Sequence, residues 1–128
     1  MTDFVPGFLD LVMPVYNKTA RNTESAITGG GGGGYDITRD RFWMLSVKEV
    51  FGNNNNGIAE GQQLAYFRDV ATTDAQRIQY DDGGVARTVC LRSSHMYTAD
   101  TESNITTSGA INYYFASSAY AFQPAMCI

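Results

Sequence analysis

The side chains that could act as acid, base or nucleophile are few in this sequence. His95 is the only histidine among 128 residues, and Cys90 precedes it by five positions. A histidine serves as a general base only where a nucleophile and an orienting group lie within reach. Cys90 falls in an apolar stretch of strand type, where alternation gives no reason for the thiol and the imidazole to meet. We therefore expect His95 to contact solvent or ligand, and we expect no catalytic residue and no enzyme activity.

Sets of metal-binding and phosphate-binding residues are missing from the sequence. Its two cysteines cannot form a four-ligand zinc site, and Asp3, Asp10, Asp36 and Asp40 lack the spacing of a calcium loop. The glycine run at residues 29–34 is not followed by the lysine and hydroxyl of a phosphate-binding loop, so it is typical of a flexible surface loop. We expect no metal site and no cofactor.

Arg92 is the charged residue at the end of an apolar strand pattern over residues 85–91. As a ligand contact it would offer a planar fork to a carboxylate or a sugar hydroxyl. The structural interpretation is stronger, because a guanidinium at the end of a core strand needs a buried partner. We predict that Arg92 lies partly buried against Glu49 or Glu60 and fixes the base of the loop that follows it.

A capping box positions Glu49. Ser46 can accept from the backbone N–H of Glu49 while the Glu49 carboxylate returns to the N–H of Ser46, which predicts a short helix from this point to Gly52. Trp43 stands in the apolar run at residues 41–45 just before it, which predicts a strand. We expect Trp43, Ser46 and Glu49 to be structural residues.

The remaining elements are predicted to be short. Residues 8–16 are typical of an extended segment bent by a proline, and residues 105–115 of a hairpin with its tip at Ser108 and Gly109. Residues 122–128 are expected to close the chain as a second apolar core strand. A helix cap or a turn is expected at residues 72–74, a turn at residues 81–84, and an asparagine-rich flexible loop at residues 53–56. The pattern predicts an irregular α+β fold with mostly antiparallel strands, one or two short helices and long loops.

Cys90 and Cys127 each stand in an apolar segment of strand type. The first expectation is two free, buried thiols that act as small hydrophobic residues. A bridge between neighbouring strands is the alternative.

Charge and length limit the classes of partner. A chain of 128 residues is expected to form a single domain. Its formal net charge is −4, and its nine Lys and Arg residues make no basic patch, which argues against nucleic acid and anionic membrane surfaces. No apolar run approaches the ~20 residues of a membrane span. Residues 1–11 lack a positively charged start, so we expect no secretory signal and no membrane insertion.

The segment from residue 93 to residue 121 is rich in Ser, Thr, Asn and Tyr. Tyrosine offers contact area at low entropic cost, and Ser and Asn offer adaptable hydrogen bonds, which is a composition typical of binding loops. We therefore predict that ligand contacts come from this segment. The candidate ligand-binding residues are Ser94, His95, Met96, Tyr97, Asn112, Tyr113, Tyr114, Ser117, Ser118 and Tyr120.

Several short motifs occur along the chain in a characteristic order. They lie at residues 41–52, 58–61, 66–67, 77–80, 90–93, 108–109 and 123–125. In this order they resemble DUF6273, a domain of unknown function that is common in gut bacteria and their phages. The resemblance covers most of the chain, from about residue 12 to residue 128.

The resemblance implies a compact fold similar to the C-type-lectin-like and formylglycine-generating-enzyme-like group. In such folds the segment between the last two core strands displays a variable surface, while activity does not follow from the fold. Some members look like targets of diversity-generating retroelements, which rewrite codons near the C-terminus. Residues 93–120 have the composition that such mutagenesis leaves. A solvated hairpin of ordinary composition explains the same residue types.

Two functions from different classes follow. The first is a recognition module on a phage virion or a bacterial surface, which binds a protein or a glycan on a bacterial cell. The second is a structural virion domain of a head, tail or fibre, whose tyrosines pack against other subunits or against further copies of the chain. The mass in solution distinguishes them, because the structural role requires a stable oligomer.

Overall fold

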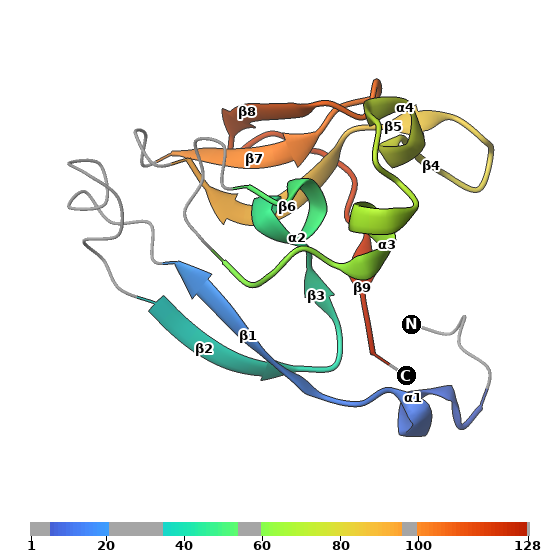
Figure 1. Ribbon diagram of the computed structural model, residues 1–128, viewed down its shortest axis with the longest axis vertical. Coiled ribbons are helices and arrows are strands. Elements are labelled where there is room, and N and C mark those ends of the chain that lie inside the picture. The colour runs from blue at the N-terminus through green and yellow to red at the C-terminus, as the bar shows by residue number, and fades with distance from the viewer. Residues whose placement is uncertain (1–5, 21–34, 54–59, 96–99, 128) are drawn as a thin grey trace.

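The computed structural model describes residues 6–20, 35–53, 60–95 and 100–127. Within these ranges the chain is a small α+β domain of short, mostly antiparallel strands and short helices, as predicted (Figure 1). The strands are β1 (Val15–Ala20), β2 (Tyr35–Asp40), β3 (Trp43–Met44), β4 (Gln79–Tyr80), β5 (Ala86–Arg87), β6 (Val89–Ser94), β7 (Thr101–Ile105), β8 (Ile111–Phe115) and β9 (Pro124–Ala125).

Helices are more numerous in the described ranges than the one or two expected. They are α1 (Phe8–Leu11), α2 (Val47–Phe51), α3 (Ala65–Asp69) and α4 (Asp74–Arg77). Each spans little more than one turn, which explains why periodicity could not reveal them. None of the helices in this part of the chain is long and apolar enough to cross a membrane.

The central element is a three-stranded antiparallel sheet in the order β6–β7–β8. β7 and β8 pair in continuous register, whereas the register of β6 on β7 shifts between Cys90 and Ser94. The predicted hairpin with its tip at Ser108 and Gly109 is confirmed, and Gly109 has the left-handed φ of 82° that glycine favours. The predicted strand over residues 85–91 is interrupted at Thr88, whose carbonyl accepts from the N–H of Ala121.

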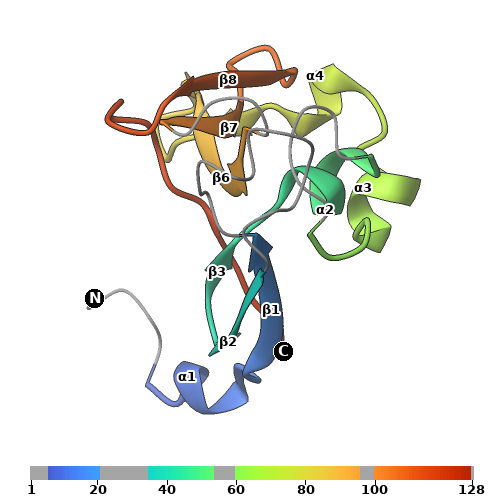
Figure 2. The same cartoon turned by 90° about the vertical axis from the view of Figure 1, so that its left-hand side faces the viewer.

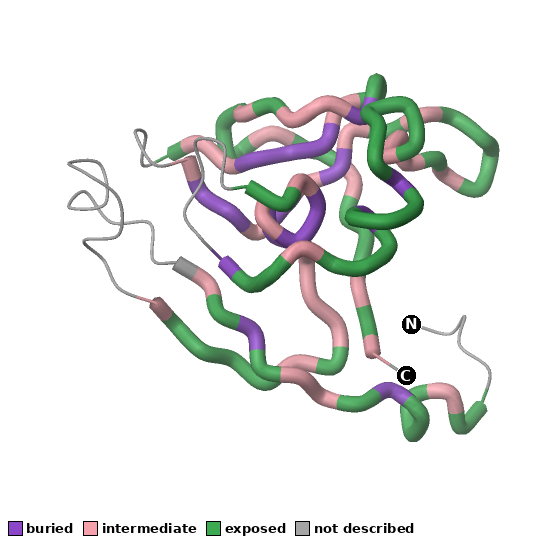
Figure 3. Tube along the Cα trace, in the orientation of Figure 1, coloured by how far each residue is buried: buried purple, intermediate pink, exposed green. Residues whose placement is uncertain are grey.

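One face of this sheet forms the hydrophobic core. Residues that pair directly across an antiparallel ladder point to the same face. Val89 pairs with Ile105, and Ile105 pairs with Ile111, so the three side chains share one face. Ile105 and Ile111 pack with Val47 and Val50 of α2. The buried segments accordingly concentrate on β6, β7 and α2 (Figure 3).

The capping box that opens α2 is confirmed. The Glu49 N–H donates to Ser46 Oγ at 3.1 Å, and the Ser46 N–H donates to Glu49 Oε2 at 2.9 Å. Gly52 ends the helix with a φ of 77°, and its N–H donates to the carbonyl of Lys48. β3, the turn and this helix therefore follow one another as the sequence predicts.

The hairpin tip packs directly on α4. A Cβ added at Gly109 would lie 1.7 Å from the carbonyl oxygen of Asp74, so no side chain fits at this position. The predicted cap before α4 is present, since Gln76 Oε1 accepts from both the N–H and the hydroxyl of Thr73. Phe67 of α3 belongs to the core cluster, together with Val47 and Val50 of α2.

The first described segment differs from the prediction. Residues 8–16 were predicted to be one extended strand, but Phe8–Leu11 forms the one-turn helix α1, which begins after Gly7 in a left-handed conformation with φ 84°. β1 follows and forms an antiparallel hairpin with β2, a strand that the sequence analysis did not predict. This N-terminal arm, α1 with the β1–β2 hairpin, extends away from the sheet (Figure 2).

The end of the chain is not the core strand that was predicted. Only β9 is regular, and it pairs with β3, while Cys127 forms an isolated bridge with Met13. Phe122 is exposed. The chain end is thus held by two separate pairings, of β9 with β3 and of Cys127 with Met13. Cys90 and Cys127 are free and half-buried, so the alternative of a bridge between them is wrong.

Candidate functional site

A buried ion pair lies beneath the sheet, between β6 and α2. Arg92 Nη1 and Nη2 donate to the two carboxylate oxygens of Glu49, each at 2.7 Å, and Nη1 also donates to the carbonyl of Met44 at 2.7 Å. The side chains are only 7 % and 9 % exposed. The predicted contact of Arg92 with a carboxylate is therefore confirmed, in the bidentate geometry that suits a guanidinium.

Glu60 completes this network from the loop before α3. Its Oε2 lies 3.7 Å from Arg92 Nε and accepts from Ser93 Oγ at 2.9 Å. Its carbonyl accepts from Ser46 Oγ at 2.6 Å, and the N–H of Val47 donates to Ser93 Oγ. Glu60 is fully buried, so its carboxylate joins segments of the chain and is not accessible to a ligand.

A pocket of about 440 Å³ lies over the sheet face opposite α2. Glu102 pairs with Tyr114, and Asn104 pairs with Cys90, so these side chains share the face that does not enter the core. All four residues line the pocket. Arg92 reaches the same pocket, which connects the buried network to it.

Two of the polar groups that line the pocket, Glu102 and Asn104, offer hydrogen-bond acceptors. Glu102 Oε1 accepts from Ser94 Oγ at 3.0 Å. Burial raises the pKa of the Glu102 carboxyl, and the hydrogen bond from Ser94 opposes this rise. Asn104 is 2 % exposed, and its Oδ1 has no hydrogen-bond partner among the described residues. A buried acceptor without a partner is a group that a ligand can satisfy.

The Cys90 thiol lies in the same pocket. Burial, and to a smaller degree the charge of Glu102, raises its pKa above the usual range. Since the thiolate is the nucleophilic form, this environment disfavours a reactive cysteine.

Exposed aromatic side chains line the pocket. Tyr114 and Tyr120 lie edge to face with ring centroids 6.0 Å apart, and the exposed Phe122 also belongs to the lining. The segment that carries Tyr120 is held at both ends: the Ala116 N–H donates to Asp100, and Ala121 lies in a bridge to β6. The chain end thereby crosses over the polar face of the sheet.

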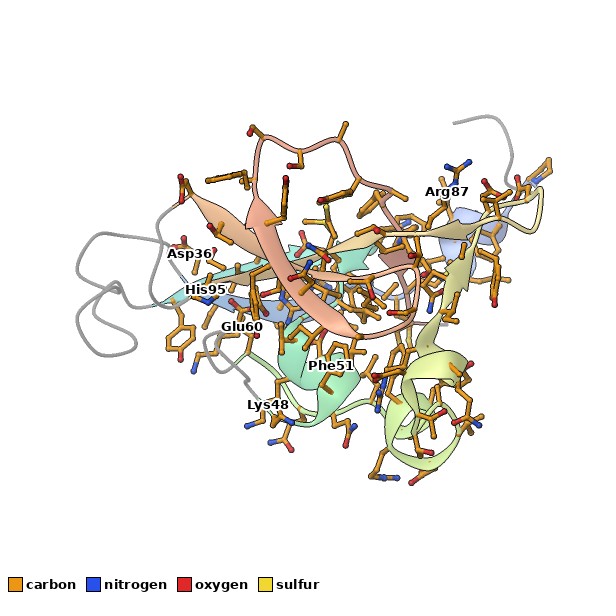
Figure 4. The ribbon with its side chains drawn as sticks, turned by 90° about the horizontal axis from the view of Figure 1, so that it is seen from above. Asp36, Lys48, Phe51, Glu60, Arg87 and His95 are labelled. Carbon is orange, nitrogen blue, oxygen red and sulfur yellow. The ribbon has the colours of Figure 1, made fainter. Side chains whose placement is uncertain are left out.

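His95 lies outside this pocket, at the end of β6. Its ring packs edge to face on Tyr113 with a centroid distance of 4.6 Å, and burial lowers its pKa. Figure 4 shows His95 at the end of the molecule away from Arg87 and on the same side as Glu60. Cys90 thus lies within β6 and lines the pocket, whereas His95 follows the last residue of β6 and does not line it.

The predicted ligand-binding residues fall into three groups. Tyr114, Ser118 and Tyr120 line the pocket, and Ser94 contacts it through Glu102. His95, Asn112, Tyr113 and Ser117 do not line it, and Tyr113 faces the core side of the sheet with Ser103, its partner in the ladder. Met96 and Tyr97 lie outside the described residues, as do residues 29–34 and most of the predicted asparagine loop.

Sequence reasoning missed Glu102, Asn104 and Phe122 as pocket residues. The alternation of residues 101–105 contained a signal, because it places Glu102 and Asn104 on the face opposite Ile105. Nothing in the sequence showed that the chain end would cross this face.

In the described part of the chain, no group of three or more His, Cys, Asp or Glu side chains is placed to hold a metal ion. The model of the family described as "Domain of unknown function (DUF6273)" matches residues 3–128. No curated protein and no solved structure matches the chain.

Proposed function

This chain belongs to the DUF6273 family of domains of unknown function, and on that premise we propose that it is a non-enzymatic recognition module. It binds a protein or glycan of a bacterial cell surface through its C-terminal surface, as part of a phage virion or a bacterial surface protein. The observation that carries the proposal is the pocket over the polar face of β6–β7–β8, with a buried unpartnered acceptor inside and exposed aromatic rings around it.

The composition of the pocket supports binding. Aromatic side chains at an opening and a few fixed polar groups inside are the usual division of labour in a ligand site. Tyr114 and Tyr120 are 49 % and 36 % exposed although each has a ring neighbour, so apolar area is left for a partner. Ser94 already holds Glu102 in place, which reduces the ordering that binding would require.

The finer fold assignment is part of the same proposal. A relationship to the C-type-lectin-like group would make the segment between β6 and β9 the displayed surface, and in this chain that segment supplies most of the aromatic lining. If a diversity-generating retroelement acts on the coding sequence, differences between close relatives should concentrate in residues 93–120 and spare the buried network around Arg92.

The direct test is binding of the labelled chain to intact gut bacteria. The double variant Tyr114→Ser, Tyr120→Ser removes the aromatic opening of the pocket. A matched control is Tyr66→Ser, Tyr80→Ser, which removes two rings that are 55 % and 62 % exposed on α3 and β4. Saturable binding that the first variant loses and the control keeps supports recognition. Equal binding by both folded variants would contradict it.

A second candidate function, subunit assembly in a virion, is favoured by the N-terminal arm. Leu11, Tyr16 and Ile37 are 62 %, 76 % and 69 % exposed, and the arm is exposed along most of its length (Figure 3). Apolar area on a projecting arm is typical of an interface. Sedimentation of the intact chain tests this: a stable oligomer that Leu11→Ser, Ile37→Ser converts to monomer supports assembly, and a monomeric parent chain contradicts it.

A further inference from the structure

The pocket over β6–β7–β8 has chemistry that selects one class of ligand. We propose that it takes a basic side chain of a partner polypeptide, an alkylammonium or guanidinium group on an apolar stem, with Glu102 and Asn104 as its polar contacts. This inference rests on the proposed recognition function and names the ligand class of the same site.

Hydrogen-bond acceptors at the floor of the pocket call for a donor. Glu102 and Asn104 stand two residues apart on β7 and face the same side of the sheet. Glu102 Oε1 has one donor, Ser94 Oγ, and Asn104 Oδ1 has no partner within the described residues. A buried acceptor left without a donor is destabilising. A ligand with several N–H donors would satisfy both groups at once.

The charge inside the pocket is negative. Arg92 also lines it, and its Nε has no hydrogen-bond partner among the described residues. The charge of this guanidinium is nevertheless matched, because Nη1 and Nη2 donate to both oxygens of Glu49 and Nε lies 3.7 Å from Glu60. Glu102 forms no ion pair with a lysine or arginine in the part of the chain that the structure describes. Burial raises the pKa of the Cys90 thiol, which also lines the pocket, and thereby disfavours its thiolate. A cation would therefore meet one uncompensated carboxylate.

The walls suit an apolar stem that carries a cation. Tyr114, Tyr120 and Phe122 line the pocket, and aromatic rings pack on methylene groups and attract a cation that lies over their faces. The volume of about 440 Å³ falls within the usual range for a small-ligand pocket.

The titration of Glu102 should make the affinity for a cationic ligand depend on pH. Burial raises the pKa of this carboxyl, and a bound cation would lower it again. Affinity for a cation is therefore expected to increase as pH rises through the pKa of Glu102 in the free protein. A neutral ligand would show no such dependence.

The test is calorimetric titration of the purified chain with Nα-acetyl-arginine amide and Nα-acetyl-lysine amide. Nα-acetyl-citrulline amide is the matched neutral probe, since it keeps the shape of arginine without the charge. We expect saturable binding of at least one basic probe, at least tenfold weaker binding by citrulline, and a loss of about tenfold or more in Glu102→Gln. The control Asp82→Asn removes the same charge in an exposed turn and should bind normally.

The outcomes separate this inference from the proposed function. Equal binding of the citrulline probe, or binding of methyl glucosaminide in place of the amino-acid amides, would overturn the ligand class. Absence of binding by every basic probe would overturn it as well. If cell binding still requires Tyr114 and Tyr120 while Glu102→Gln binds cells normally, the recognition function is supported and the basic ligand class is contradicted. If the tyrosine variant binds cells like its control, the proposed function itself fails.

Discussion

Arg92 and Glu49 join β6 to the first turn of α2 through two parallel hydrogen bonds of 2.7 Å. Glu49 is also the N3 residue of the capping box, so one carboxylate both starts the helix and neutralises the guanidinium. Arg92 reaches the pocket on the other side of the sheet. The core, the helix start and the candidate site therefore share one buried ion pair.

Removal of the guanidinium should be costly. Arg92→Ala leaves Glu49 and Glu60 buried without their cation, and we expect a loss of about 3–5 kcal/mol in the free energy of unfolding measured with urea. Arg68→Ala is the matched control, because Arg68 forms its ion pair with Asp69 at the exposed surface and should change the urea midpoint little. A similar small change in both variants would show that the network does not support the fold.

The hairpin tip should tolerate no side chain. The control is Gly84→Ala, in the turn at residues 81–84, which imposes a left-handed alanine in open space. It should lower the free energy of unfolding by about 1–2 kcal/mol. Gly109→Ala imposes the same strain and also drives Cβ into the carbonyl of Asp74, so we expect at least about twice that loss. Urea unfolding of the two variants measures the difference. Equal losses would mean that the tip does not pack on α4.

The two helix starts should differ in strength. Ser46→Ala removes the cap of α2 and leaves the buried carbonyl of Glu60 without its donor, for an expected loss of about 2–4 kcal/mol. Thr73→Ala removes the equivalent hydroxyl at the exposed start of α4 and should cost about 1 kcal/mol or less. Thermal unfolding of both variants, compared with the parent chain, tests the order.

Glu102 should make stability depend on pH. Its pKa is raised in the folded protein, so its contribution to stability is fully present below the unfolded-state pKa and is lost as pH rises through the folded-state value. Glu102→Gln should therefore raise the urea midpoint at pH 7.5, and this gain should vanish at about pH 4 and below. A gain that persists unchanged in acid would rule out the titration of this carboxyl as the cause.

Local features of the fold could be predicted from the sequence. The capping box needs only Ser46 and Glu49 at the right spacing, and the hairpin tip needs only Gly109 between alternating residues. The partner of Arg92 could be named as one of two carboxylates, because a buried charge restricts the choice.

Features that depend on distant contacts could not be predicted. α1 begins at a left-handed Gly7, which nothing in the pattern of residues 8–16 indicates. The pocket requires the register of β7 and the crossing of Ala121 onto β6, and both are set by pairing between residues far apart in the chain. Tyr114 and Tyr120 were named from composition. Alternation alone puts Glu102 and Asn104 on the face opposite Ile105, but only the pairing shows that this face forms a pocket.

The most direct test of the proposed recognition function is hydrogen exchange of the intact chain with and without envelope fragments of gut bacteria. We predict that backbone amides of β7, β8 and the segment that carries Tyr120 become protected, while those of α3 and α4 exchange as in the free protein. Protection confined to the helices or to the N-terminal arm, with β7 and β8 unchanged, would contradict a recognition site over the polar face of the sheet.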